Sequence, residues 1–256
     1  MRRAWTVVEL LVVLALAVVL AALAMPALSS ARSHAKLTMT LARLGQNAAV
    51  FHAYTADWAE QFPAPCDHAG PAYFIRSAAL KSDLILADYF ESAEYWWLAM
   101  TDRYYNGTVF DRSWFPVEAE RYGQEGNVVF DYPCTFVSRP DYWDPLTRLR
   151  GNTQWGAVRL SSVLFPSKKV LLNSGFYHAL RRSKRCYPEG ADTKVPLCDG
   201  RRYIVPLVCA DGSASTPWRE EIFEGYPNGN GTLIYHSADS PLACHTLSGV
   251  RGRDLR

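Results

Sequence analysis

Residues Val7 to Met25 read VVELLVVLALAVVLAALAM, and this stretch decides how the chain is organised. It carries a single charged side chain, Glu9. As an α-helix it spans roughly 28 Å at about 1.5 Å per residue, enough to cross the hydrocarbon core of a bilayer. The stretch therefore predicts one membrane-spanning helix near the N-terminus.

Two basic residues, Arg2 and Arg3, precede this apolar stretch. Positive charge beside a membrane helix favours the cytoplasmic side. We therefore expect a single-pass protein of the cytoplasmic membrane, with its N-terminus in the cytoplasm. Everything after Met25 would then lie outside, in the periplasm or at the cell surface.

A secretory signal peptide cleaved after Ala27 or Ser30 is the ordinary alternative. The apolar core of a signal peptide is typically about 7–15 residues long, shorter than this stretch. A signal peptide does not require an acidic residue such as Glu9. A carboxylate near hydrocarbon is also energetically costly unless it has a partner. Glu9 is thus predicted to have a function.

The residues from Arg2 to Val13, RRAWTVVELLVV, resemble the processing site of type IV prepilins and type II secretion pseudopilins. The resemblance implies cleavage between Ala4 and Trp5 by a prepilin peptidase, which also methylates the new N-terminus at Trp5. It makes Glu9 the helix carboxylate of the family, and Pro26 falls where many pilins carry a helix-bending proline. The family usually has Gly and Phe where this chain has Ala4 and Trp5.

The new amine at Trp5 and the carboxylate of Glu9 are both costly in lipid unless they are paired. Pairing Glu9 of one subunit with the amine of its neighbour would set the axial register of a growing filament. We therefore expect a structural subunit of a pilus or a secretion pseudopilus. It would assemble with other pilin or pseudopilin subunits through its N-terminal helix rather than act as an enzyme.

A second helical pattern follows Pro26. Its apolar residues recur at spacings of three, four and seven, which marks one face of an amphipathic helix: Leu37, Leu41, Leu44, Ala48, Phe51 and Trp58. The opposite face is expected to be solvated through Arg32, Lys36, Arg43 and Asn47. Tyr54, Asp57, Phe62 and Pro63 then stand in the order that pilin-like proteins of one large bacterial class show.

The predicted domains are a leader at 1–4, an assembly helix at 5–26, a stalk helix at 27–62 and a head at 63–256. The head should begin with a partly helical insertion over about 63–126. Strands are expected at Val128–Phe130, Thr135–Val137, Ala157–Leu160, Lys169–Leu172, Arg202–Cys209 and Thr232–Tyr235. Asp211-Gly212, in a segment that resembles the same pilin-like class, is expected to form a hairpin turn. The fold class is α+β, with the long helix packed on an antiparallel sheet as in pilins.

Six cysteines lie beyond the apolar stretch and are candidate disulfide residues: Cys66, Cys134, Cys186, Cys198, Cys209 and Cys244. An even number outside the membrane favours disulfides over zinc, and the pairing stays open. The histidines match no short-range zinc pattern. No metal or cofactor is expected.

The other function classes have weaker support. The net charge of +2 is spread along the chain, so no nucleic-acid partner is expected. No Gly-x-Ser-x-Gly element of a hydrolase occurs. The alternative to a structural subunit is a membrane-tethered extracytoplasmic binding protein, for example for polysaccharide, that uses the aromatic residues Tyr95, Trp96, Trp97, Tyr104 and Tyr105.

Overall fold

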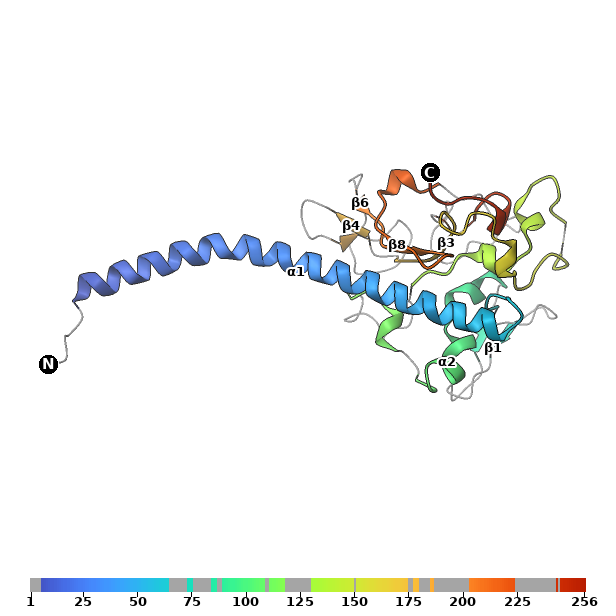
Figure 1. Ribbon diagram of the computed structural model, residues 1–256, viewed down its shortest axis with the longest axis horizontal. Coiled ribbons are helices and arrows are strands. Elements are labelled where there is room, and N and C mark those ends of the chain that lie inside the picture. Colours follow the sequence, from blue (N-terminus) through green and yellow to red (C-terminus); the bar gives the residue numbers. More distant parts are fainter. Residues whose placement is uncertain are drawn as a thin grey trace. The chain divides into compact units, whose positions relative to one another are not determined.

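The computed structural model describes residues 6–64, 73–75, 84–86, 89–108, 111–117, 130–149, 151–174, 177–179, 185–186, 203–223, 243 and 245–256. The chain divides into two compact units, Met1–Met39 and Thr40–Arg256. The boundary lies inside one long helix, between the expected boundaries after residues 26 and 62. The second unit, called the head below, contains all the strands described here (Figure 1).

Helix α1 runs from Val7 to Asp57 without interruption. It contains Pro26, which removes one backbone donor but does not end the helix. Among the described residues, α1 is the one helix long and apolar enough to cross a membrane, and its apolar window is fully exposed. The predicted membrane-length helix is therefore present, and the stalk helix is its direct continuation.

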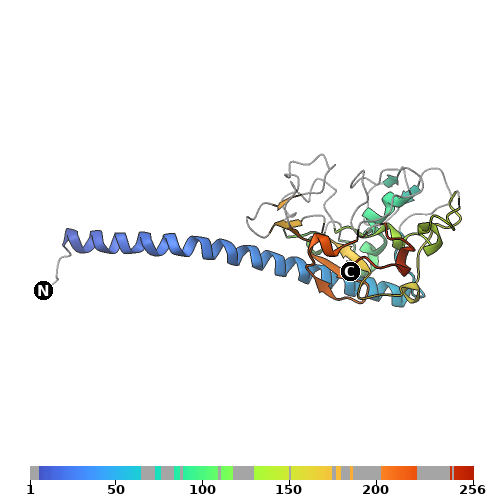
Figure 2. The same ribbon diagram turned by 90° about the horizontal axis from the view of Figure 1, so that it is seen from above.

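The main sheet of the head is antiparallel, with strand order β3-β7-β8. Its strands are β3 (Val170–Asn173), β7 (Leu207–Cys209) and β8 (Ala214–Ser215). Val170 faces Cys209 and Asn173 faces Leu207, with a register shift between Val170 and Leu172. Figures 1 and 2 show this sheet beside the part of α1 that belongs to the head. A long helix with a small antiparallel sheet agrees with the expected α+β class.

The turn between β7 and β8 is the predicted hairpin turn. Gly212 has a φ of +85°, a value that glycine adopts without a steric penalty. The side chain of Asp211 accepts a hydrogen bond from the Ser213 backbone N–H at 2.9 Å. Asp211-Gly212 thus forms the turn through glycine conformation and an aspartate side-chain contact.

Smaller elements complete the described head. Strands β1 (Tyr73–Ile75) and β2 (Leu84–Leu86) pair with each other, and β5 (Arg185–Cys186), β4 (Tyr177–Ala179) and β6 (Tyr203–Ile204) form a second three-stranded sheet in that order. Helix α2 covers Leu98–Tyr104 after the 3₁₀ turn η1 at Phe90–Tyr95. The partly helical insertion therefore contains both helical turns and a short hairpin.

The strand predictions are correct in two places. Lys169–Leu172 matches β3 to within one residue, and Arg202–Cys209 contains β6 and β7, which Pro206 separates. Thr135–Val137 is wrong, because Cys134–Phe136 is the 3₁₀ turn η4. Ala157–Leu160 is also wrong, since it makes a single bridge, from Arg159 to Gln61. Val128–Phe130, apart from Phe130, and Thr232–Tyr235 lie outside the described residues.

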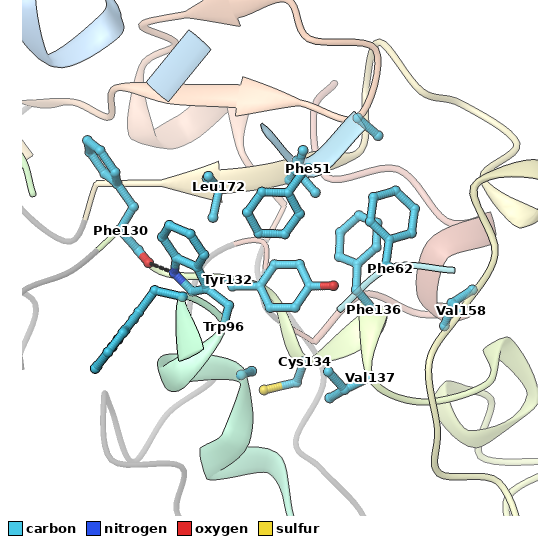
Figure 3. Close-up of a cluster of buried hydrophobic side chains, with 14 of the residues drawn as sticks. Phe51, Phe62, Trp96, Phe130, Tyr132, Cys134, Phe136, Val137, Val158 and Leu172 are labelled. Carbon is cyan, nitrogen blue, oxygen red and sulfur yellow. Dashed lines mark hydrogen bonds between the residues drawn. The ribbon is translucent and has the colours of Figure 1, made fainter. Parts of the chain in front are cut away.

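An aromatic cluster occupies the core between α1 and the rest of the head. Figure 3 shows Phe51 of α1 beside Tyr132, with Trp96 on one side and Phe62 and Phe136 on the other. The ring of Phe51 lies 5.2 Å from the rings of both Trp96 and Tyr132. Burying each such side chain contributes roughly 1.5–3 kcal/mol, so the C-terminal part of α1 is held mainly by this packing.

Both faces of the main sheet are covered. Leu172 and Val208 join the core that includes Phe51, whereas Val170, Leu207 and Cys209 pack in a second cluster. That second cluster also includes Ile222, Ala243 and Leu255. A sheet buried on both faces has continuous apolar strands, which is why β3 and β7 show no alternation of apolar and polar residues.

Candidate functional site

The first turn of α1 contains Glu9, the residue for which a function is predicted. Its carboxylate accepts a hydrogen bond from the Thr6 backbone N–H at 2.8 Å and from the Thr6 hydroxyl at 3.0 Å. The Glu9 backbone N–H donates to the Thr6 hydroxyl at 3.2 Å. These reciprocal bonds form a capping box.

The capping box was detectable in the sequence as Thr6-x-x-Glu9, a signal that the reasoning from composition and resemblance missed. It gives Glu9 a local structural role in addition to the predicted one. It also holds the carboxylate at the N-terminal end of the helix, where the helix dipole favours a negative charge. Ala4 and Trp5 lie outside the described residues, so the cleavage site and the pairing of Glu9 with an amine remain predictions.

The helix surface beyond this turn is apolar on all sides. Its large side chains are exposed at Val7, Val8, Leu10, Leu11, Val12, Val13, Leu14, Leu16, Val18, Val19, Leu20, Leu23, Met25 and Leu28. A helix that is apolar all round needs an apolar environment such as lipid or neighbouring helices. The N-terminal part of α1 thus combines one carboxylate at its start with a long apolar surface whose exposure to water is unfavourable.

The C-terminal part of α1 is buried on one face, and this face differs from the predicted one at Asn47. Asn47 was expected to be solvated but is fully buried. Its side-chain amide donates to the Ser113 carbonyl at 2.6 Å, and its oxygen accepts from the Tyr105 hydroxyl at 2.5 Å. Arg43 also donates to the Phe115 carbonyl at 3.0 Å. The polar side chains are there because they satisfy backbone and phenol groups of a segment packed on the helix.

The predicted row of binding aromatics is mostly core. Trp96, Trp97 and Tyr105 are buried, and Tyr95 and Tyr104 are half-buried. Trp97 stacks on Trp114, with ring centroids 4.9 Å apart. This row therefore cannot bind a ligand as a continuous exposed surface.

A different aromatic patch is exposed at the end of α1. We call Tyr54, Asp57, Trp58, Arg103 and Tyr104 the terminal patch. Trp58 is half-exposed and stacks on Tyr54 with centroids 5.6 Å apart and an 18° interplanar angle. Asp57 accepts from the Tyr104 hydroxyl at 2.7 Å and pairs with Arg103 at 3.1 Å. The terminal patch thus places an accessible ring beside polar groups held in fixed positions.

Two of the candidate disulfide cysteines have described side chains. Cys134 and Cys209 are buried thiols, and the thiol of Cys134 approaches the Phe90 carbonyl at 3.8 Å. Both lie in apolar clusters on strand or turn segments of the core. The disulfide prediction therefore depends on Cys66, Cys186, Cys198 and Cys244, whose side chains lie outside the described part.

The histidines are dispersed in the part of the chain that the structure describes. His34 is exposed on α1, His52 is half-buried, and His245 is buried with its ring 5.0 Å from that of Trp143. The described residues contain no group of three or more His, Cys, Asp or Glu arranged to hold a metal ion. Of the others, His68 and His236 lie outside these residues, as does the side chain of His178.

No family model, curated protein or solved structure matches the chain. Two features of the chain itself therefore bear on its function. These are the N-terminal part of α1 with Glu9 and, in the head, the terminal patch.

Proposed function

We propose that the chain is a pilin-like or pseudopilin-like structural subunit that assembles through the N-terminal part of α1. The observation that carries the proposal is a membrane-length helix, exposed and apolar on all sides, whose first turn holds a single carboxylate, Glu9. An ordinary anchor needs no acidic residue at this depth. A carboxylate in that position is useful when another molecule brings a positive charge to it.

The partner of Glu9 would be the methylated amine of Trp5 in a neighbouring subunit. Thr6 can satisfy part of the hydrogen-bonding capacity of the Glu9 carboxylate but cannot neutralise its charge. A neighbour's amine would supply the missing charge and fix the axial offset between subunits. The apolar side chains of the helices would then pack together and keep water from the pair.

The proposal includes processing and orientation. A prepilin peptidase would remove residues 1–4 on the cytoplasmic side and methylate Trp5. The head would stand outside the cytoplasmic membrane, where the filament presents it to its surroundings. Continuity of α1 across Pro26 supports this arrangement, because an unbroken helix links the membrane segment to the head.

The first experiment is intact mass measurement and N-terminal sequencing of the full chain, extracted from cells that contain a prepilin peptidase. A chain that begins at N-methylated Trp5 is the expected result. A chain that begins after Ala27 or Ser30 would show a cleaved signal peptide. A chain that begins at uncut Met1 would show a simple membrane tether. Each of these last two results would overturn the proposal.

A second experiment tests Glu9 directly. Glu9→Gln keeps the size and the capping oxygen of the side chain but removes its charge. We expect it to abolish the oligomers captured by chemical cross-linking in the membrane while the head stays folded. Glu60→Gln, on an exposed residue of the head, is the matched control and should cross-link as the unchanged chain does. Equal oligomer yields from both variants would contradict the role of Glu9.

A second candidate function is binding of a neutral polysaccharide at the terminal patch. Trp58 carries this candidate, because an accessible ring can stack on a sugar face while Asp57 and Arg103 hydrogen-bond to hydroxyl groups. Titration of cello-, chito- and xylohexaose, followed by tryptophan fluorescence, should give saturable binding that Trp58→Ala abolishes. Leu146→Ala, at an exposed site outside the patch, is the control. No saturation with any of the three sugars would count against this candidate.

A further inference from the structure

The head contains a buried polar cluster that neither assembly nor ligand binding uses. Lys169 directly precedes β3, and Asp254 lies near the C-terminal end, 85 residues further on. Both side chains are buried, at 0% and 1% exposure. The Lys169 Nζ atom lies 3.0 Å from Oδ2 and 3.1 Å from Oδ1 of Asp254. The amine nitrogen thus lies within hydrogen-bond distance of both oxygens of one carboxyl group.

Thr246 connects the two groups. Its hydroxyl oxygen accepts a hydrogen bond from the Lys169 Nζ at 2.6 Å, and the same hydroxyl donates to Oδ1 of Asp254. A proton can therefore pass from the nitrogen to that carboxyl oxygen through one hydroxyl group. The other oxygen, Oδ2, accepts from the Val170 backbone N–H at 2.8 Å, a donor placed to stabilise negative charge there.

Burial of the cluster disfavours charged groups. Burial raises the pKa of the Asp254 carboxyl, and the nearby Lys169 ammonium opposes that shift. Transfer of one proton from the ammonium to the carboxylate gives a neutral amine and a carboxylic acid, which removes both charges from the interior. A neutral lysine amine is a nucleophile.

We propose that Lys169 and Asp254 are a modification site at which the head forms an intramolecular amide cross-link. The Lys169 nitrogen attacks the Asp254 carboxyl carbon, and the carbonyl electron pair moves onto Oδ2, beside the Val170 N–H. Thr246 takes a proton from the nitrogen and delivers one to Oδ1. Oδ1 then leaves as water, the carbonyl re-forms, and an amide remains. One N–C bond forms, one C–O bond breaks, and no oxidant or reductant is needed.

Backbone contacts hold Asp254 beside Lys168, the residue that precedes Lys169. The Asp254 N–H donates to the Lys168 carbonyl at 2.9 Å, and the Phe223 N–H donates to the Asp254 carbonyl at 2.8 Å. The amine and the carboxyl group are thus fixed near each other before any reaction, which lowers the entropic part of the barrier. The cross-link would join the C-terminal segment covalently to the start of β3, and it does not depend on the assembly function.

Intact mass measurement of the folded full chain in detergent tests the proposal. The expected mass is lower by one water molecule than that of the chain beginning at the same residue. Tandem mass spectrometry after digestion should find a branched peptide that joins Lys169 to Asp254, also after boiling in denaturant. A full mass with linear peptides covering both residues would overturn the proposal and leave an ordinary buried ion pair.

Four variants separate the chemistry from a purely structural role. Lys169→Met should restore the mass of one water molecule, whereas Lys168→Met, at the half-buried neighbour, should keep the cross-link. Thr246→Val removes the proton relay and should lower the cross-linked fraction at least tenfold at early times after synthesis, while Thr246→Ser should keep it. Equal cross-linking rates in the Val and Ser variants would contradict the relay. Loss of the cross-link in Lys168→Met would contradict the assignment of the nucleophile.

Discussion

The two parts of helix α1 meet opposite demands with one continuous backbone. Between Val7 and Leu28 the large apolar side chains are exposed on every side. From Thr40 onward one face is buried and contains polar as well as apolar residues, among them Asn47 and Phe51. The first part depends on an apolar environment outside the chain, whereas the second part depends on the head.

The two parts of α1 should therefore tolerate substitutions to different degrees. In the first part the large apolar side chains are exposed, so we expect their exact size and shape to matter less. In the second part each residue meets a particular ring or carbonyl, so its size and hydrogen bonds matter. Substitutions of equal chemistry in the two parts should therefore have unequal effects.

Among the changes considered, Phe51→Ala should lower the free energy of unfolding of the head most. Truncating a fully buried Phe leaves a cavity beside Trp96 and Tyr132, and such changes cost about 3–5 kcal/mol. Leu14→Ala, in the exposed part, should leave the unfolding of the head unchanged. Denaturant unfolding of the full chain in detergent, followed by tryptophan fluorescence, measures both. Equal shifts of the midpoint would abolish the distinction between the two parts.

Asn47→Leu should have the next largest effect. It removes the acceptor of the Tyr105 hydroxyl and the donor to the Ser113 carbonyl, leaving two buried polar groups without that partner. We expect a loss of about 1–3 kcal/mol in the free energy of unfolding. Asn47→Leu combined with Tyr105→Phe should recover part of this loss, because the phenol group is then removed as well. No recovery would mean that the cost comes from shape rather than from hydrogen bonding.

The sequence predicts the two parts of α1 unequally, for a physical reason. A long run such as Val7–Met25 is recognisable because a bilayer imposes one simple requirement, apolarity over a fixed length. The apolar stripe of the stalk also predicts Leu44, Ala48 and Phe51 correctly as buried. Asn47 could not be predicted, because its burial depends on Ser113 and Tyr105, which only the folded chain brings to it.

The head was predicted less well because little of its described part is regular. The Asp211-Gly212 turn and β3 have local signals, in a turn dipeptide and an apolar run. Thr135–Val137 has the same kind of apolar composition but forms a 3₁₀ turn after Pro133, where core packing rather than strand pairing buries it. The cluster of Lys169, Thr246 and Asp254 joins residues far apart in sequence, so no spacing pattern indicates it.

Alkaline pH should destabilise the head and not the apolar part of α1, which has no Cys or Tyr from Val7 to Met25. Burial raises the pKa of the Cys209 thiol to about 12, above about 8.5 in an unfolded chain. The folded state therefore holds this proton more tightly, and the resulting stability is complete below about pH 8.5 and is lost as the pH rises toward 12. Cys209→Ala should flatten the fall in unfolding free energy over that range. If the unfolding free energy of Cys209→Ala fell with pH as steeply as that of the original chain, the attribution of this fall to Cys209 would be wrong.

Thr6→Ala should have the smallest and most local effect. It removes the hydroxyl that caps the Glu9 N–H and donates to the Glu9 carboxylate, so the first turn of α1 should fray. Hydrogen exchange in detergent should be roughly tenfold faster at the Glu9 amide and unchanged at Phe51. Thr6→Ser keeps the hydroxyl and should exchange as the original chain does. Faster exchange at Phe51 as well would show that the two parts of the helix are coupled, because a local change at the first turn would then reach the part of α1 that the head holds.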